Sequence, residues 1–116
     1  MEELERYAKD SIKKGAIVVV LIGSLVKENY TAFSDADVVI VVGEDGRRPM
    51  DRMPEFIDPK LPLDVEPRVY TISEMKTMAV SGSRMVEEAL LHGKLLAGDP
   101  KVLDELRKLR LKYMDT

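Results

Sequence analysis

The sequence contains no cysteine. Disulfide bonds and thiolate metal sites are therefore excluded, because both need the cysteine sulfur. Proteins of reducing compartments are typically free of disulfides, so we expect a cytoplasmic protein. Glutamine is also absent and Asn29 is the single asparagine, whereas 34% of the residues are charged. Few heat-labile amides together with many Glu, Lys and Arg side chains favour a thermophilic source.

Long apolar segments are missing as well. No apolar run approaches the ~18 residues needed to cross a bilayer, so no membrane-spanning segment is predicted. The N-terminal stretch MEELERYAKDSIKKG is charged and lacks the apolar segment of a signal peptide. The net charge is −3, and no basic stretch is interleaved with aromatic residues. The sequence thus gives no strong signal for a membrane or a nucleic-acid partner.

The chain has 116 residues, of which 45% are hydrophobic. This length and composition predict one globular domain, residues 1–116. Two runs, AIVVVLI at 16–22 and ADVVIVV at 36–42, are apolar without alternation, which is typical of strands buried on both faces. Further elements are predicted from periodicity and capping residues: helices at 2–14, 84–92 and 100–114 and a short strand at 94–98.

The middle of the chain is rich in Gly, Pro and charge. Residues 43–60 predict a long loop with one helical turn near 50–57, and its three arginines (Arg47, Arg48 and Arg52) are expected to be solvated. Prolines in the extended segment 61–71 predict either a strand at a sheet edge or one that is broken in the middle. The sequence TISEM predicts a helix-capping box that starts at Thr71 or Ser73 and includes Glu74. The order of elements indicates a mixed α/β or α+β class.

The stretch GSLVKENYTAFSDAD, residues 23–37, joins the two buried runs. Side chains alternate along a strand, so Asp35 and Asp37 would point the same way. Carboxylates at this spacing can hold a divalent cation such as Mg²⁺, usually together with substrate phosphates. Gly23 lets a backbone amide approach a phosphate closely, and Ser24 adds a hydroxyl donor. We interpret the stretch as a phosphate-binding turn beside a metal-binding pair.

Each feature alone has a simpler explanation. Two aspartates at the start of a strand are often only solvated or capping, and most Gly-Ser pairs are ordinary turns. The combination of both features, in this order and between two buried strands, is what favours a functional site.

This combination resembles the signature of the nucleotidyltransferase superfamily. The signature has an apolar residue, Gly, then Gly or Ser, a spacer, and Asp-x-Asp or Asp-x-Glu within an apolar strand; residues 22–42 match it at every position. The short chain is similar to the minimal nucleotidyltransferases, whose members often have nucleic-acid-cleaving HEPN-domain partners. The stretches VEPRVYTISEM and MVEEALLHGKLLAGD are also similar to later segments of these domains, which extends the resemblance to about residues 16–99.

The resemblance implies a nucleotidyltransferase fold, with a small mixed β-sheet flanked by helices. It also implies that Asp35, Asp37 and a third carboxylate are the catalytic and metal-binding residues. Judged by the spacing to the following Tyr-Thr pair, the third carboxylate is Glu66, and Asp64 is the alternative two residues earlier on the same strand face.

The same resemblance assigns nucleotide binding to Gly23, Ser24 and Lys27. Lys27 stands where family members often have an arginine, and Glu28 follows it. The implied cofactor is Mg²⁺ or Mn²⁺, and the implied substrate is ATP or another nucleoside triphosphate.

Two functions from different classes follow from the resemblance. The first is an enzyme that transfers a nucleoside monophosphate, AMP from ATP, to a hydroxyl acceptor, with a HEPN-domain toxin as the protein partner that it neutralises. The second is a catalytically degenerate domain that binds nucleotide or masks a partner, which Glu28 and Glu66 favour. An unrelated α/β domain with a chance Asp-x-Asp is the third interpretation. The sequence leaves the acceptor, the base preference and the oligomeric state open.

Overall fold

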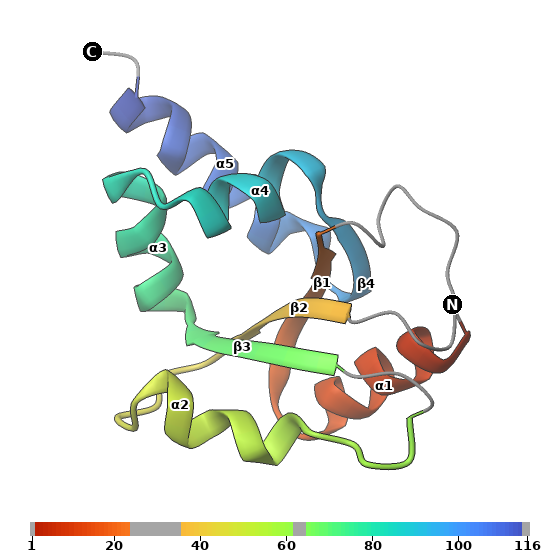
Figure 1. Cartoon of the computed structure of the whole chain (residues 1–116). Helices are drawn as coiled ribbons and strands as arrows, with labels where there is room; N and C mark the ends of the chain where they lie inside the picture. The colour runs from red at the N-terminus through yellow and green to blue at the C-terminus, as the bar shows by residue number, and fades with distance from the viewer. Residues whose placement is uncertain (1, 24–35, 62–64, 115–116) are drawn as a thin grey trace.

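A four-stranded mixed sheet forms the centre of the protein (Figure 1). The computed structural model describes residues 2–23, 36–61 and 65–114. In space the strand order is β3-β2-β1-β4; β1 runs antiparallel to β2 and β4, whereas β2 and β3 are parallel. The strands are β1 (Ala16–Ile22), β2 (Ala36–Val42), β3 (Val65–Thr71) and β4 (Lys94–Gly98). All four lie where the sequence predicts them, and the mixed α/β class is confirmed.

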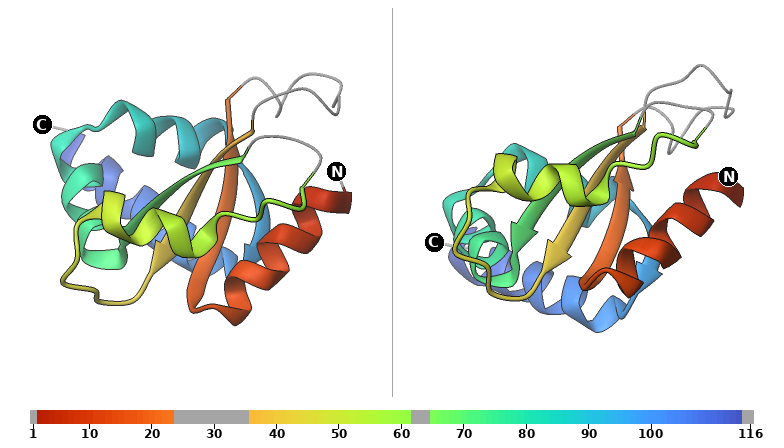
Figure 2. Two further views of the ribbon diagram at one scale, coloured as in Figure 1. Left: turned by 60° about the horizontal axis from the view of Figure 1, so that its bottom comes forward. Right: turned by 90° about the horizontal axis from the view of Figure 1, so that it is seen from below.

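Helices cover both faces of the sheet, so the protein has three layers (Figure 2). The described helices are α1 (Glu2–Lys13), α2 (Pro49–Arg52), the 3₁₀ turn η2 (Met53–Phe56), α3 (Ile72–Ser81), α4 (Arg84–His92) and α5 (Pro100–Met114). α1 and η2 pack on one face, and α3, α4 and α5 pack on the other. None of the described helices is long and apolar enough to span a membrane.

The two central strands explain why the fold is stable. Val18 and Val20 of β1 pack into the core beneath α3, α4 and α5, whereas Val19 and Leu21 pack into the core beneath α1. All four side chains are at most 1% exposed. Burying apolar surface on both faces stabilises a strand by about 25 cal/mol per Å² of area removed from water. The strand sequence does not alternate between apolar and polar residues because both faces of the strand are buried, as predicted.

β3 lies at the edge of the sheet, beside β2 alone. Pro67 stands in the middle of this strand, opposite Val38. An edge strand tolerates a proline because only one side of its backbone needs hydrogen-bond donors. Of the two alternatives that the prolines left, the edge position is the one the structure shows, because β3 continues unbroken through Pro67.

The transition from β3 to α3 is a complete capping box. The Thr71 hydroxyl accepts a hydrogen bond from the Glu74 amide at 3.1 Å, and the Glu74 carboxylate accepts one from the Thr71 amide at 2.8 Å. Both bonds satisfy donors that the first turn of a helix leaves free. Of the two starts considered from the sequence, Thr71 is the N-cap, whereas the Ser73 hydroxyl donates to Glu44.

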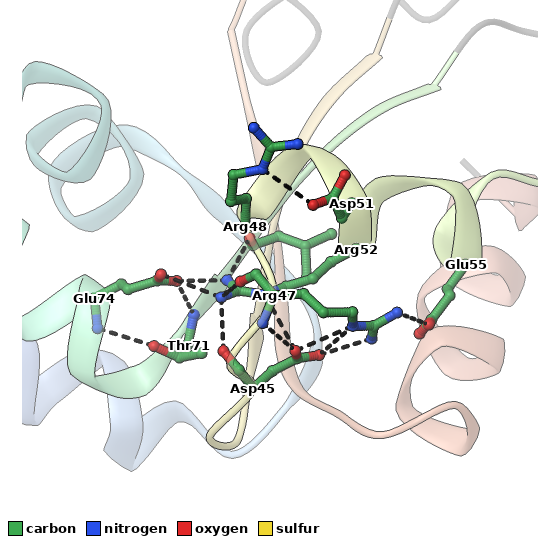
Figure 3. Close-up of polar contacts among 9 residues, drawn as sticks. Asp45, Arg47, Arg48, Asp51, Arg52, Glu55, Thr71 and Glu74 are labelled. Carbon is green, nitrogen blue, oxygen red and sulfur yellow. Dashed lines mark hydrogen bonds and ion pairs between the residues drawn. The ribbon is translucent and has the colours of Figure 1, made fainter.

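Arg52 lies at the centre of a polar network at this end of the sheet (Figure 3). Its guanidinium donates to the Glu74 carboxylate at 2.5 Å, to the Val69 carbonyl at 3.3 Å and to the Asp45 carbonyl at 2.8 Å. Its side chain is 2% exposed. The expectation that Arg52 is solvated is wrong, because three segments of the chain supply acceptors for one buried guanidinium.

The other two loop arginines remain at the surface. Arg47 pairs with Asp45 and Glu55, and Arg48 pairs with Asp51 at 3.1 Å. Their side chains are 46% and 80% exposed. The Arg47 hydrogen bond lowers the pKa of Asp45 to about 2, which keeps that carboxylate charged. The solvated position expected for Arg48 is confirmed.

Replacing Glu74 should destabilise the fold through Arg52. We expect Glu74→Gln to lower the free energy of unfolding by about 2 kcal/mol at neutral pH, because it removes the closer of the two carboxylates that pair with the buried Arg52 guanidinium and leaves only the Asp45 carboxylate, at 3.8 Å, while Glu74 itself is partly solvated. The hydrogen bond from Arg52 lowers the pKa of Glu74 below its ordinary 4.5. This contribution is therefore complete above pH 4.5 and is lost as the pH falls through the folded-state pKa. Urea unfolding across the acid range would measure the difference from wild type.

Asp51→Asn is the matched control, since it removes the exposed partner of Arg48. We expect it to change the free energy of unfolding by less than about 0.5 kcal/mol at any of these pH values. Equal losses in both variants, or a Glu74→Gln loss that persists unchanged at acid pH, would contradict the role assigned to Arg52.

Candidate functional site

The C-terminal end of β1 meets the N-terminal end of β2 at the start of the stretch that joins them. Ile22, the last residue of β1, lies opposite Asp37 in the antiparallel register. Gly23 follows with a φ of +88°, a backbone conformation that residues other than glycine rarely adopt. A Cβ built on Gly23 would lie 3.5 Å from Oδ2 of Asp37. The Asp37 carboxylate therefore lies directly against Gly23.

The parallel pairing of β2 and β3 places a second carboxylate beside the first. Asp37 and Glu66 are register partners, so their side chains leave adjacent strands on the same face of the sheet. Asp37 is half-buried and Glu66 is exposed. Val39, two residues after Asp37, packs into the core beneath α3, α4 and α5, so the two carboxylates lie on that face.

A third carboxylate reaches the same end of the sheet from the helical layer. The Gly23 amide donates a hydrogen bond to Oε1 of Glu88, at 3.2 Å. Glu88 belongs to α4, which packs on β1 through Val86, Ala89 and Leu90. Sequence reasoning missed Glu88, because no local pattern links a helix surface residue to a turn 65 positions earlier.

Several predicted site residues lie outside the described residues: Ser24, Lys27, Asp35 and Asp64. The predictions for them, including the choice between Asp64 and Glu66, stay predictions. Of the predicted set, the structure describes Gly23, Asp37 and Glu66, and it brings these three to one end of the sheet.

The chemistry of this end suits a hard divalent cation. Asp37 and Glu66 supply carboxylate oxygens, the ligand type that Mg²⁺ prefers. Within the described residues, no three His, Cys, Asp or Glu side chains are grouped closely enough to hold a metal ion. The two described carboxylates therefore suit a metal site that takes further ligands from substrate phosphates or from Asp35.

Arg68 adds a positive charge along the same strand. It follows Glu66 by two residues, so the two side chains share a face of β3, and both are exposed. A hollow of about 640 Å³ lies elsewhere, between α1 and residues 57–60. The strand ends, and not this hollow, bring together the residue types that the sequence singled out.

Similar folds occur in known toxin-antitoxin complexes. A crystal structure of a toxin-antitoxin with AMP-PNP aligns with a TM-score of 0.53 and 15% identity, over 98% of this chain and 83% of that one. The toxin-antitoxin MntA-HpeT, as a mutant with two aspartates changed to glutamate, aligns with a TM-score of 0.52 and 14% identity, again over 98% of this chain and 83% of that one. A tri-AMPylated Shewanella oneidensis HEPN toxin in complex with an MNT antitoxin aligns with a TM-score of 0.48 and 16% identity, over 96% of this chain and 84% of that one.

No curated protein matches the chain. The family model described as "Nucleotidyltransferase domain" matches residues 1–114, nearly the whole sequence and more than the segment in which the motifs were found. The fold shared with the solved structures and the carboxylates at the ends of β2 and β3 agree with this match. The chain therefore belongs to the nucleotidyltransferase domain family.

Proposed function

We propose that the protein is a Mg²⁺-dependent enzyme that transfers AMP from ATP to a hydroxyl group of a protein partner. The observation that supports this most directly is the register of Asp37 with Glu66, beside the turn at Gly23. Membership of the nucleotidyltransferase domain family supports the reaction class.

Asp35 and Asp37 would hold the divalent cation that binds with the triphosphate, and Glu66 would either complete a second metal site or take the proton of the acceptor hydroxyl. When bound, Mg²⁺ would neutralise the negative charge of the triphosphate and of the transition state. Mn²⁺ has a similar preference for carboxylate oxygen and is the alternative. Asp37 is held at the end of a buried strand, so its carboxylate is oriented before any ligand arrives.

The turn after β1 would hold the phosphates. Gly23 has a positive φ, which glycine adopts without steric strain, and no side chain at that position covers the backbone. Ser24 would donate its hydroxyl to a phosphate oxygen, and Lys27 would supply a positive charge. Gly23 lies against Asp37, so the phosphates and the carboxylates would meet.

The proposed reaction is a single displacement at the α-phosphorus of ATP. The acceptor oxygen attacks the α-phosphorus and forms a new phosphorus–oxygen bond, while the bond to the β-phosphate oxygen breaks and pyrophosphate leaves. The acceptor hydroxyl loses its proton to a nearby base, for which Glu66 is the candidate because it is exposed beside Asp37. Positioning and charge stabilisation would supply most of the rate enhancement.

The partner we propose is a HEPN-domain toxin, which the protein would modify and so neutralise. The sequence resembles the minimal nucleotidyltransferases, which are often paired with such proteins, and the fold is similar to that of toxin-antitoxin structures. One of these structures contains AMP-PNP, and the mutant in the other changes two aspartates that are two positions apart. Asp35 and Asp37 have the same spacing.

Removal of both motif aspartates should abolish nucleotide binding. We expect calorimetry with ATP, GTP, CTP and UTP to show Mg²⁺-dependent binding to wild type. We expect at least about a 30-fold weaker affinity in the double variant Asp35→Asn/Asp37→Asn, because two metal ligands are lost. The double variant Asp104→Asn/Glu105→Gln on α5 carries the same charge change at exposed positions and should bind like wild type.

Equal affinities in the two double variants would place any nucleotide site away from β2. Loss of nucleotide binding without loss of binding to the toxin would favour the partner-masking function, since that role does not need transfer.

Glu66 should matter more for transfer than for binding. We expect Glu66→Gln to leave the affinity for MgATP within about threefold of wild type and to slow AMP transfer by about a hundredfold or more, because the base is lost. Transfer can be followed with ATP labelled on the α-phosphate and a HEPN-domain partner. Label from the γ-phosphate should not appear on the partner.

Glu105→Gln, an exposed position on α5, is the single-site control and should transfer at the wild-type rate. If Glu66→Gln also transfers at that rate, Glu66 is not the base, and Asp64→Asn becomes the next variant to measure.

A further inference from the structure

One carboxylate at the proposed site has no role in the chemistry described above. Glu88 accepts a hydrogen bond from the Gly23 amide through Oε1, at 3.2 Å. The contact joins the exposed surface of α4 to the first residue after β1. It is made by a backbone donor at the turn where the triphosphate is proposed to bind.

Gly23 lies between two carboxylates from different layers of the fold. Asp37 approaches from β2, 3.5 Å from the position of a Cβ on Gly23, and Glu88 approaches from α4 at the amide nitrogen. A carboxylate oxygen and a phosphate oxygen are both anionic acceptors that favour backbone amides of this kind. Glu88 thus accepts a hydrogen bond from the kind of backbone amide to which a phosphate oxygen would also bind.

The neighbouring residue shows that α4 does not need Glu88 for packing. Glu87 pairs with Arg110 of α5 at 3.3 Å, and so joins the two helices of this layer. Val86 and Ala89 bury the inner side of α4. Glu88 is exposed, and among the described residues its hydrogen bond is with Gly23.

We propose that Glu88 competes with the nucleotide phosphates for the Gly23 amide, and so lowers the affinity of the site for triphosphates; this inference rests on the proposed function. In the nucleotide-free protein, Glu88 accepts the hydrogen bond of the Gly23 amide. When a triphosphate binds, the side chain of Glu88 leaves the amide, and an oxygen of the phosphate replaces it.

The direction of the effect follows from charge and exposure. A triphosphate brings several negative charges next to Glu88, and like charges a few ångströms apart repel each other even near the surface. An exposed side chain can move into water at little cost, so the repulsion lowers affinity without preventing binding. Adenosine, which lacks phosphates, should not be affected by this competition.

The test compares the affinities of Glu88 variants for MgATP and for adenosine by calorimetry. We expect Glu88→Ala to bind MgATP about three- to tenfold more tightly than wild type, because the competing acceptor and its charge are both removed. Glu88→Gln keeps a neutral hydrogen-bond acceptor, so its affinity for MgATP should lie between those of wild type and Glu88→Ala. Glu87→Gln is the matched control on the same helix, and it should bind MgATP like wild type. Adenosine affinity should be the same in all four proteins.

A second measurement follows the amide directly. In nitrogen–proton NMR spectra of the nucleotide-free protein, the Gly23 amide resonance should shift strongly in Glu88→Ala and little in Glu87→Gln. Addition of inorganic triphosphate with Mg²⁺ should move the Gly23 resonance of wild type and of Glu88→Ala toward a common position. A purely structural role of Glu88 would not produce this convergence.

The outcomes separate this inference from the proposed function. Affinities for MgATP that are equal or weaker in Glu88→Ala, combined with a loss in Asp35→Asn/Asp37→Asn, would overturn the inference alone. Wild-type affinity in the aspartate double variant would overturn the proposed site. Absence of MgATP binding in every protein, Glu88→Ala included, would overturn both.

Discussion

The lateral register of β1, β2 and β3 is the constraint on which the proposed site depends. Ile22 lies opposite Asp37, and Asp37 lies beside Glu66, because the backbone hydrogen bonds of the sheet align these positions. A slip of β2 by one residue would turn every one of its side chains to the other face and would separate Asp37 from Gly23 and Glu66. The interactions that stabilise the sheet therefore also assemble the carboxylates.

The two ends of the sheet differ in whether the charged side chains there have partners of opposite charge among the described residues. At the Thr71 end, the buried guanidinium of Arg52 is satisfied by Glu74 and by backbone carbonyls. At the Gly23 end, Asp37 and Glu66 gather, and within the described part of the chain neither takes part in an ion pair. Uncompensated carboxylates are tolerated there because the strands end near water, where desolvation is small. The first end holds the fold together, and the second is suited to binding a cation.

The helical layer on the site's face serves both purposes within one turn of α4. Glu87 pairs with Arg110 of α5, whereas Glu88 reaches Gly23. Successive residues of a helix point about 100° apart, since an α-helix has 3.6 residues per turn, so adjacent glutamates can face different neighbours. The packing of α4 on β1 through Val86 and Leu90 fixes which of the two faces the strand end.

The sequence by itself determined the elements, whereas the tertiary structure decided their polar partners. The apolar runs, the prolines of the edge strand and the Thr71–Glu74 capping box are local patterns, and local patterns reflect backbone geometry and burial directly. The Gly-Ser pair and the Asp-x-Asp motif within residues 22–42 likewise carry the resemblance to the family whose model matches the chain.

What the sequence could not show is which distant groups meet. Arg52 stood in a charged loop and was expected to be solvated, yet it is buried against Glu74, 22 residues away. Glu88 lies on the exposed surface of a helix that the sequence predicts, and its partner Gly23 is 65 residues away. The alignment of Asp37 with Glu66 depends on the pairing of two strands. Such contacts are decided by the pairing of strands and by the packing of helices on the sheet, because charged side chains carry no periodic signal that identifies their partners.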